Sequence, residues 1–471
     1  MLNQKSVSKK LQKLMLVSLI LATSFSQVLS SQLKKQKPNI VIVMADDLGW
    51  GDVGFNGNKI IKTPGLDKLA SSGVVLDRFY SAAPVCSPTR GSCLTGRHPF
   101  RYGIYFANVG FMKKEEITLA EVLKKEGYTT GHFGKWHLGA ISNTILDGRR
   151  GGAETKYLST PWDNGFDECF STEQAVPTWN PMENQSLKNP TRYWTAPGVY
   201  ETENLKGDDS RVIMDRALPF MQKAVADEKP FFTVIWFHTP HSPVVAGPKY
   251  LDMYKEYDEN KQHYYGCITA MDAQMARLQS ELKVLGVDKN TVITFCSDNG
   301  PAGEGGGIRQ HPGKRQQGTS GGFRGRKGSL YEGGVRVPAF IVWPNQIQPN
   351  ERIDFPGVTN DYFSTVLGLV GINIPDDRPY DGIDLIKAIK ADKKERDGFI
   401  GFQSKTQKSL VTQQYKLITI DGEKFELYDL LNDPKETNNI AATHPKVVEE
   451  MKLQLEEWVE SCKRSDEGND Y

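Results

Sequence analysis

The sequence predicts an α/β fold: a large, mixed but mostly parallel sheet flanked by helices, followed by a small antiparallel sheet with one helix. Between residue 39 and about residue 370, continuous apolar runs rich in β-branched residues alternate with amphipathic helical patterns. This alternation is typical of a parallel sheet covered by helices on both faces. From about residue 398 short strands and turns replace it, and an amphipathic helix ends the chain. We therefore expect a large α/β domain over 31–395 and a C-terminal subdomain over 396–471.

Residues 1–30 have the pattern of a secretory signal peptide. Four lysines precede the apolar run 14–22, and Val28 and Ser30 suit the −3 and −1 positions of a cleavage site. The apolar run is about nine residues long, whereas a bilayer span needs about twenty. We therefore expect an exported protein (periplasmic or secreted, or lysosomal in a eukaryote) without stable membrane insertion. An uncleaved anchor is the less favoured alternative.

The composition limits the class of protein. The 471 residues are 38% hydrophobic and 24% charged, which is ordinary for a globular protein, and the formal net charge is +1. A charge so close to zero gives no field that would attract nucleic acid, so we expect no nucleic-acid partner. Six cysteines are too few, in an exported chain of this length, for disulfides to form the framework.

The first half of the chain supplies two of the expected strands. Residues 39–45 form a continuous apolar run suited to a central strand buried on both faces. Residues 65–73 and 116–126 have helical spacing, and a glycine closes each helix. Residues 128–133 form the next expected strand. From about 140 to 208 the periodicity fades, and the density of aromatic residues there favours an ordered irregular segment over disorder.

The second half repeats the alternation before the pattern changes. Helices are expected over 210–226 and 264–285, and strands over 231–237, 291–296 and 337–343. The expected elements of the C-terminal subdomain are strands at 398–403, 409–412, 415–420 and 425–429 and a helix over 445–462.

Polar side chains follow the expected strands. Asp46 and Asp47 follow the first strand, and Asp298 and Asn299 follow a later one. In open α/β sheets, sites form outside the carboxyl ends of the strands, so these groups are expected to meet. Each pair alone is more often a turn or a cap, but their joint occurrence at strand ends favours a site. Three carboxylates and one amide suit a hard divalent cation such as Ca²⁺ or Mg²⁺, and no Cys/His spacing suggests zinc.

Cationic and imidazole side chains follow other strands. Lys135 and His137 follow the second expected strand, and His238 and His241 follow the third. With Arg90 they would surround an anion beside the metal. Such a set is suited to transferring a tetrahedral oxyanion group such as sulfuryl or phosphoryl, because the metal and cations offset charge while histidines move protons.

One short motif is rarer than these patterns. Residues 86–97 read Cys-Ser-Pro-Thr-Arg-Gly-Ser-Cys-Leu-Thr-Gly-Arg, which resembles the motif in which type I sulfatases carry a cysteine that is oxidised to formylglycine (3-oxoalanine). The resemblance to these enzymes of the alkaline-phosphatase-like superfamily extends from Pro38 to about Leu430. Its other parts are the opening strand with its two acids, Gly134-Lys135-Trp136-His137, Ser297-Asp298-Asn299-Gly300, and the segment 325–338.

The resemblance implies a cofactor, a modified residue and a partner. Asp46, Asp47, Asp298 and Asn299 would bind Ca²⁺, in preference to Mg²⁺, and Cys86 as formylglycine would lie at the same metal. One hydroxyl of the hydrated aldehyde would attack sulfur in line as the alcohol leaves, and the second hydroxyl would then drive sulfate off. A cysteine or serine has no second hydroxyl, so a formylglycine-generating maturation enzyme is an implied partner.

The resemblance also implies the roles of four other side chains. Arg90 would hold the formylglycine, and Lys135 and Lys327 would bind sulfate oxygens. His137 would act as the base in the step that releases sulfate.

The residue that protonates the leaving group is the open assignment. The family places it as a histidine followed by x-Pro after a strand, and both His238-Thr239-Pro240 and His241-Ser242-Pro243 fit. We favour His241, because Pro-His-Ser-Pro-Val is closer to the usual context of the family. The chosen histidine must reach the ester oxygen.

Two segments are expected to set specificity. Tryptophans of the segment 140–208, with Tyr193 and Arg192, would stack on sugar rings, and cations of the loop 301–326 would meet further sulfates or carboxylates. The alternative is that the tryptophans fill the core and the charges are solvated. The candidates for substrate contact are Trp162, Trp179, Trp194, His238, Arg309, His311, Lys314, Arg315, Arg324 and Arg326.

The sequence therefore predicts a sulfatase that acts on a sulfated poly- or oligosaccharide. One rival is a phosphonate or phosphate-ester hydrolase on the same scaffold. A second rival is an inactive homologue that binds sulfated glycans with Cys86 unmodified. The sugar, the sulfated position, exo or endo action and the oligomeric state stay open.

Overall fold

The structure is a computed structural model that describes residues 37–183, 185, 188–302, 315, 317–344 and 346–471. The expected signal peptide at residues 1–30 lies outside this range, as do Arg309, His311 and Lys314. Residues 39–471 form one compact unit. This grouping does not test the predicted division of the chain at residue 395, which stays a prediction. None of the helices in the described ranges is long and apolar enough to cross a membrane.

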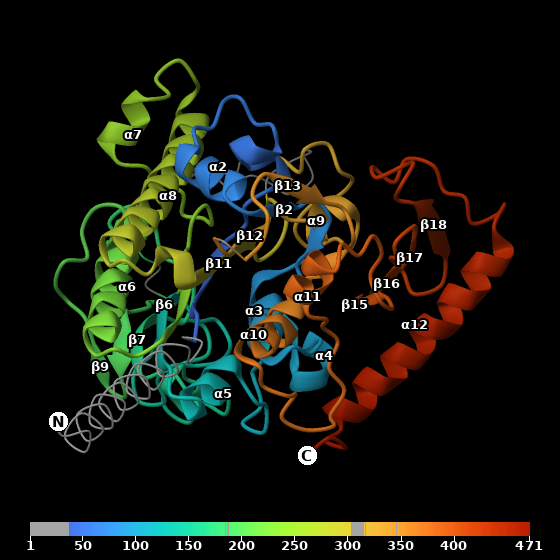
Figure 1. Cartoon of the computed structure of the whole chain (residues 1–471), viewed down its shortest axis with the longest axis horizontal. Coiled ribbons are helices and arrows are strands. Elements are labelled where there is room, and N and C mark those ends of the chain that lie inside the picture. The colour runs from blue at the N-terminus through green and yellow to red at the C-terminus, as the bar shows by residue number, and fades with distance from the viewer. Residues whose placement is uncertain (1–36, 184, 186–187, 303–314, 316, 345) are drawn as a thin grey trace, which may run out of the picture. The chain divides into compact units, whose positions relative to one another are not determined.

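A ten-stranded sheet forms the centre of this unit, in the order β13-β2-β12-β11-β1-β10-β6-β7-β8-β9. Several of its strands, among them β6, β11 and β12, are labelled in Figure 1. Its core is β1 (Asn39–Ala45), which pairs in parallel with β10 (Phe231–Trp236) on one side and β11 (Thr291–Ser297) on the other. The next strand, β6 (Thr129–Lys135), is parallel to β10. All residues of β1, β10 and β11 are buried, as the continuous apolar runs predicted.

The outer strands make the sheet mixed, which confirms the predicted fold class. On one side, β12 (Phe340–Val342) runs antiparallel to β11, followed by β2 (Val74–Leu76) and β13 (Glu351–Ile353). On the other side, β7 (Glu168–Thr172) is parallel to β6.

The segment 140–208 is less irregular than expected, because it supplies β7 and the antiparallel strands β8 (Trp194–Ala196) and β9 (Val199–Tyr200). The sequence of β7, Glu-Cys-Phe-Ser-Thr, mixes polar and apolar residues. Its pairing with β6 and β8 buries it, and neither neighbour is visible in the local pattern.

Helices cover both faces of the sheet. Val41, Val43 and Ala45 of β1 pack in a core with α2 (Pro64–Ser71), α6 (Asp209–Ala226) and α8 (Glu259–Val284). The alternate residues Ile40 and Ile42 pack with α3 (Cys86–Thr95), α5 (Leu119–Lys125), α10 (Asp361–Val370) and α11 (Leu385–Lys390). This alternation follows from the two-residue period of a strand.

Helix α8 begins five residues earlier than the expected start at residue 264. The side chain of Asp258 caps it by accepting a hydrogen bond from the backbone N–H of Lys261. The first turn is polar and largely exposed, so apolar periodicity did not reveal it.

The C-terminal part is the predicted antiparallel sheet with one helix. Its strands are β15 (Ile400–Ser404), β16 (Gln407–Val411), β17 (Tyr415–Thr419) and β18 (Phe425–Asp429), and α12 (Pro445–Asp466) closes the chain. One face of this sheet packs on α12, and the other packs on Tyr80, Leu330 and Val335 of the main body. The remaining short elements are η1 (Trp50–Asp52), η2 (Gly54–Asn56), β3 (Phe79–Tyr80), α4 (Pro99–Tyr102), β4 (Ile104–Phe106), β5 (Val109–Gly110), η3 (Trp162–Asn164), α7 (Pro248–Asp252), η4 (Asp288–Asn290), α9 (Glu332–Val335) and β14 (Gly357–Val358).

Candidate active site

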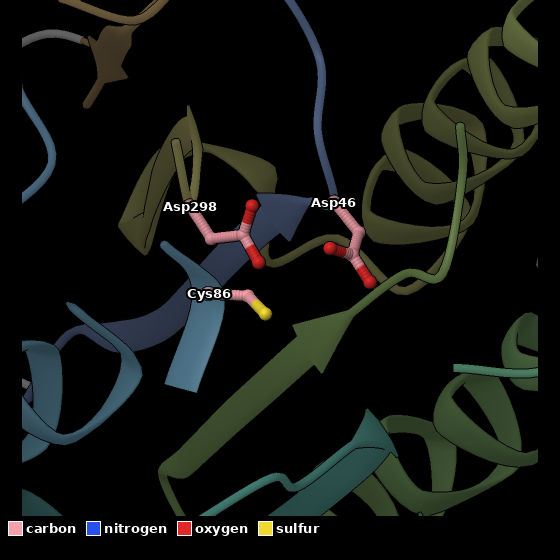
Figure 2. A group of neighbouring side chains, drawn as sticks. All are labelled: Asp46, Cys86 and Asp298. Carbon is pink, nitrogen blue, oxygen red and sulfur yellow. The ribbon is translucent and has the colours of Figure 1, made fainter. Parts of the chain in front are cut away.

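The acids at the strand ends come together at one edge of the sheet. Because Ala45 of β1 pairs with Ser297 of β11, the next residues Asp46 and Asp298 lie side by side (Figure 2). The backbone N–H of Asp47 donates to Oδ1 of Asp298 at 3.0 Å, and Nδ2 of Asn299 donates to Oδ1 of Asp47 at 2.7 Å. All four side chains are buried. Backbone register therefore assembles the predicted ligand set.

Three buried oxygens of this set fit a divalent cation. Oδ1 of Asp46, Oδ2 of Asp47 and Oδ1 of Asn299 have no hydrogen-bond partner among the described residues. Unpaired buried oxygens are costly unless a cation or water satisfies them. Hard carboxylate and amide oxygens suit Ca²⁺ or Mg²⁺.

The sulfur of Cys86 lies at the same place. Its Sγ and one carboxylate oxygen each from Asp46 and Asp298 lie within 4.8 Å of one another, and Figure 2 shows the three side chains converging. A second such group consists of Asp46, Asp47 and His241. The two groups share Asp46, so an ion bound at this carboxylate would have a ligand in common with both.

Three cations neutralise part of the acidic charge. Lys135 Nζ lies 2.7 Å from Oδ2 of Asp46, and Arg90 donates to Oδ2 of Asp298 at 2.6 Å. Lys327 pairs with Asp47. Burial opposes ionisation of Asp47, but Lys327 and His241 together hold its pKa below the usual range. In contrast, burial and the neighbouring Asp46 raise the pKa of Asp298, so the positive charge present does not fully balance this carboxylate.

Cys86 occupies the first position of α3. The free backbone N–H groups of a helix N-terminus favour a negative group there, and Arg90 follows one turn later with its guanidinium 5.3 Å from the ring centroid of Trp236. Burial raises the pKa of the Cys86 thiol. The encoded side chain is therefore a neutral thiol, and not a reactive thiolate. All six cysteines are buried and unpaired.

His137 is held in an unusual backbone conformation and contacts the first turn of α3. Its φ is +59°, in the left-handed region that non-glycine residues rarely adopt. The hydroxyl of Ser87, the residue after Cys86, donates to the His137 carbonyl oxygen, and the ring Nε2 lies 2.9 Å from Oδ1 of Asn108. Sequence reasoning missed Asn108, because an asparagine in a turn has an ordinary local explanation.

The two candidate histidines after β10 differ in environment. His241 Nε2 lies 3.8 Å from Oδ2 of Asp47, and its Nδ1–H donates to the carbonyl oxygen of Ser242 at 2.6 Å. Its side chain is 24% exposed, so Nε2 is the nitrogen available at the site. Burial lowers its pKa to about 3, and an anionic ester bound beside it would raise that pKa.

His238 points into the interior. Its Nδ1 lies 2.8 Å from Oδ2 of Asp209, and its Nε2 lies 2.8 Å from Oγ1 of Thr172. The side chain is fully buried. The structure therefore contradicts the expected substrate contact of His238, because both ring nitrogens are used within the core.

Two of the expected sugar-stacking residues are also in the core. Trp194 is buried, and Tyr193 stacks on Phe170 with ring centroids 4.0 Å apart while its hydroxyl donates to Asp209. The structure therefore contradicts a stacking role for these two residues. Trp162 and Trp179 are half-buried and stay candidates.

The described cations of the loop 301–326 differ in what they contact. Arg324 lies 3.8 Å from the ring centroid of Tyr331 and donates to the Tyr428 hydroxyl at 2.7 Å, so it fastens the C-terminal sheet. The Arg324 side chain is still 42% exposed, so its expected contact with substrate stays a prediction. Arg315 pairs with Glu259 at 2.7 Å, and Arg326 is half-buried and stays a candidate.

Comparisons with known proteins identify the family of this chain. A sulfatase family model matches residues 38–372, and a model of the C-terminal region of N-sulphoglucosamine sulphohydrolase matches residues 321–462. The chain is 33% identical to N-acetylgalactosamine-6-sulfatase of Mus musculus over 81% of this chain and 72% of that protein. It is 30% identical to the ulvan-active sulfatase of Formosa agariphila over 86% of this chain and 77% of that protein. The crystal structure of Ps i-CgsB in complex with k-i-k-neocarrahexaose matches with a TM-score of 0.78 and 26% identity, over 91% of this chain and 94% of that chain. The chain therefore belongs to the type I sulfatase family of the alkaline-phosphatase-like superfamily and is a sulfuric ester hydrolase.

Proposed function

We propose that this protein removes sulfate from a sulfated poly- or oligosaccharide, with formylglycine made from Cys86 and a bound Ca²⁺. The observation that carries the proposal is the convergence of the Cys86 side chain with Asp46 and Asp298 at the N-terminus of α3. A thiol so placed is neutral and buried. An oxidised residue at the same position would present its oxygens to the metal and to the helix N-terminus.

Asp46, Asp47, Asp298 and Asn299 are the proposed holders of the cation. The three unpaired oxygens of this set support the assignment, and Ca²⁺ is preferred to Mg²⁺. The cation would supply charge stabilisation for the sulfate group, and formylglycine would supply the nucleophilic hydroxyl. Formation of this residue requires a maturation enzyme as a partner.

The other side chains have separate proposed roles. Arg90, already directed at Asp298, holds the modified residue, and Lys135 and Lys327 bind sulfate oxygens. His137 removes a proton in the step that releases sulfate. His241 gives a proton from Nε2 to the leaving oxygen, which requires the bound anion to raise its pKa.

The carbohydrate substrate is supported by the relatives. Their names refer to N-acetylgalactosamine 6-sulfate and ulvan, and the matched crystal structure holds k-i-k-neocarrahexaose. Half-buried Trp162 and Trp179 and the cations of Arg315, Arg324 and Arg326 are the remaining described candidates for contacts with such a chain. Export of the protein and its division into 31–395 and 396–471 belong to the same proposal.

The decisive experiment is peptide mass analysis of the 86–97 segment from protein made in the native host. Formylglycine at position 86 is expected, and an intact thiol in active protein would overturn the mechanism. Protein from a host without the maturation enzyme serves as the matched control, because it should retain the thiol and lack activity.

A second experiment separates the rival functions. Aryl sulfate and aryl phosphate are offered in competition, followed by a panel of sulfated oligosaccharides. Preference for aryl sulfate is expected, whereas a strong preference for phosphate would support a phosphate-ester hydrolase. Tight binding of sulfated sugars without turnover would support an inactive glycan-binding homologue.

A further inference from the structure

We propose that Asn108 is a positioning residue for His137: its Oδ1 accepts a hydrogen bond from Nε2–H and so leaves the Nδ1 lone pair for the group formed at Cys86. The inference rests on the proposed function, in which His137 is the base of the sulfate-releasing step. It adds a residue that acts through the histidine and fixes which of the two ring nitrogens reacts.

The contact itself determines the tautomer. His137 Nε2 lies 2.9 Å from Oδ1 of Asn108, and a carbonyl oxygen can only accept a hydrogen bond. Nε2 must therefore carry a proton. Burial and Lys135 lower the pKa of His137 well below the usual range, so the imidazole is neutral and has one proton. Nδ1 is left with the lone pair.

The other ring nitrogen is buried and unused. Nδ1 of His137 has no hydrogen-bond partner among the described residues. A buried polar atom without a partner costs about 1–3 kcal/mol, and such atoms are uncommon in native interiors. Because Asn108 engages Nε2, the unpaired Nδ1 is the ring nitrogen suited to take a proton from the reacting group.

The backbone of His137 is fixed independently of its ring. The Ser87 hydroxyl on α3 donates to the His137 carbonyl oxygen, and the left-handed φ of His137 has to be maintained by such contacts. The N–H of Met112 donates to the carbonyl oxygen of Leu138 at 2.9 Å, which ties the chain after Asn108 to the chain after His137. Rotation of the imidazole ring is the remaining freedom, and Asn108 restrains it.

Asn108 is itself held in place. It lies in the turn between β4 and β5 with a φ of +63°, a conformation that asparagine tolerates well. Two cationic side chains contact the β4–β5 hairpin. Lys405 Nζ lies 4.1 Å from the ring centroid of Phe106, and Arg150 donates to the Gly110 carbonyl oxygen at 3.1 Å.

The test uses two variants that both tolerate a left-handed backbone. Asn108→Gly removes the acceptor without strain, and Asn108→Asp keeps an acceptor oxygen. The ring-nitrogen shifts of His137 are measured by NMR in the full-length protein with ¹⁵N-histidine, and His137→Gln assigns the signal. Turnover of a sulfate ester gives kcat and KM separately.

We expect wild-type His137 to be the Nε2–H tautomer. In Asn108→Gly the tautomers should mix and kcat should fall about 10–100-fold, the loss seen when a group that orients a metal-bound histidine is removed, with KM nearly unchanged. Asn108→Asp should restore the tautomer and most of kcat. Asn350→Gly is the matched control, since it removes an exposed asparagine with a φ of +59° and should change neither readout.

Two results would overturn the inference: a proton on Nδ1 in the wild type, or an unchanged tautomer in Asn108→Gly. A loss of thermal stability with an unchanged tautomer counts as the second result. If the tautomers behave as expected but no sulfate ester is hydrolysed by matured protein, the positioning contact stands and the proposed function fails.

Discussion

The strand-end edge of the active site and its outer rim are held by different kinds of structure. At the edge, Asp46 and Asp298 follow two adjacent, fully buried parallel strands, and the pairing of Ala45 with Ser297 determines their separation. At the rim, Asn108 lies in a turn and Lys327 in a loop, and each side chain reaches the site through one contact, to His137 and to Asp47.

Substitutions at the edge should change mainly the charge of the site, whereas substitutions at the rim should change mainly the positions of its functional groups. The backbone ladder between β1 and β11 positions the edge, so isosteric substitutions there should remove charge and metal affinity while the fold persists. The rim depends on individual hydrogen bonds, each of which contributes only about 0.5–1.5 kcal/mol. Substitutions there should shift the position of a functional group and produce smaller, graded losses.

The largest effect is expected for Asp298→Asn, which removes charge at the edge with almost no change in shape. Arg90 loses the closer of its two carboxylate partners and the proposed cation loses a ligand, so kcat/KM should fall about 10³-fold or more. Aryl sulfate turnover and metal analysis of the purified protein measure the effect. Asp377→Asn, at an exposed position, is the control and should retain both. Full metal content with normal turnover in Asp298→Asn would show that the edge is not the metal site.

Removal of the cation should lower stability, because the unpaired oxygens of Asp46, Asp47 and Asn299 would lose their partner. Adding Ca²⁺ back to chelated protein at 100 times its dissociation constant should stabilise the fold by about 2.7 kcal/mol. Thermal unfolding with and without Ca²⁺ gives the shift in Tm. The shift should vanish in Asp298→Asn, and an equal shift in both proteins would place the ion elsewhere.

The same contrast explains which features the sequence could predict. An apolar run such as Asn39–Ala45 specifies a buried strand by itself, and the rule that sites form at strand ends then locates Asp46 and Asp298. In contrast, His238 and His241 share one local pattern, His-x-Pro, and only packing against Asp209 and Thr172 shows that His238 is structural.

Other features have no local signal. Strand β7 is buried by its neighbours, so its mixed sequence does not predict a strand. Arg324 carries a charge suited to a substrate anion, but Tyr331 and Tyr428 from two different parts of the chain engage it. The proposed role of Asn108 depends on its contact with His137, 29 residues away in the sequence, and no pattern in the turn predicts that contact.

A comparison of His241→Gln with His238→Gln tests the assignment of the leaving-group acid. His241→Gln should lower kcat for a sugar sulfate about 10²–10⁴-fold, and much less for an aryl sulfate whose leaving group needs no proton. His238→Gln breaks the contact with Asp209 and should cost about 1–3 kcal/mol of stability, with no dependence on the leaving group. The measurements are kcat across leaving groups and the denaturation midpoint. If the loss of kcat that depends on the leaving group appeared in His238→Gln and not in His241→Gln, His238 would be the acid.

The smallest effect is expected for Gln407→Ala, in the C-terminal sheet. Gln407 Nε2 donates to the Gly328 carbonyl oxygen at 2.8 Å, and its Oε1 accepts from the Leu330 N–H at 2.9 Å. These two hydrogen bonds hold the segment that directly follows Lys327. Its loss should cost about 1 kcal/mol of stability and lower kcat only several-fold, because Lys327 keeps its pairing with Asp47. Lys408→Ala, on the opposite face of the same strand, is the control and should leave kcat unchanged. Equal kcat in the two variants would show that the C-terminal sheet supports the fold without setting the position of Lys327, and the rim would then depend on the main body alone.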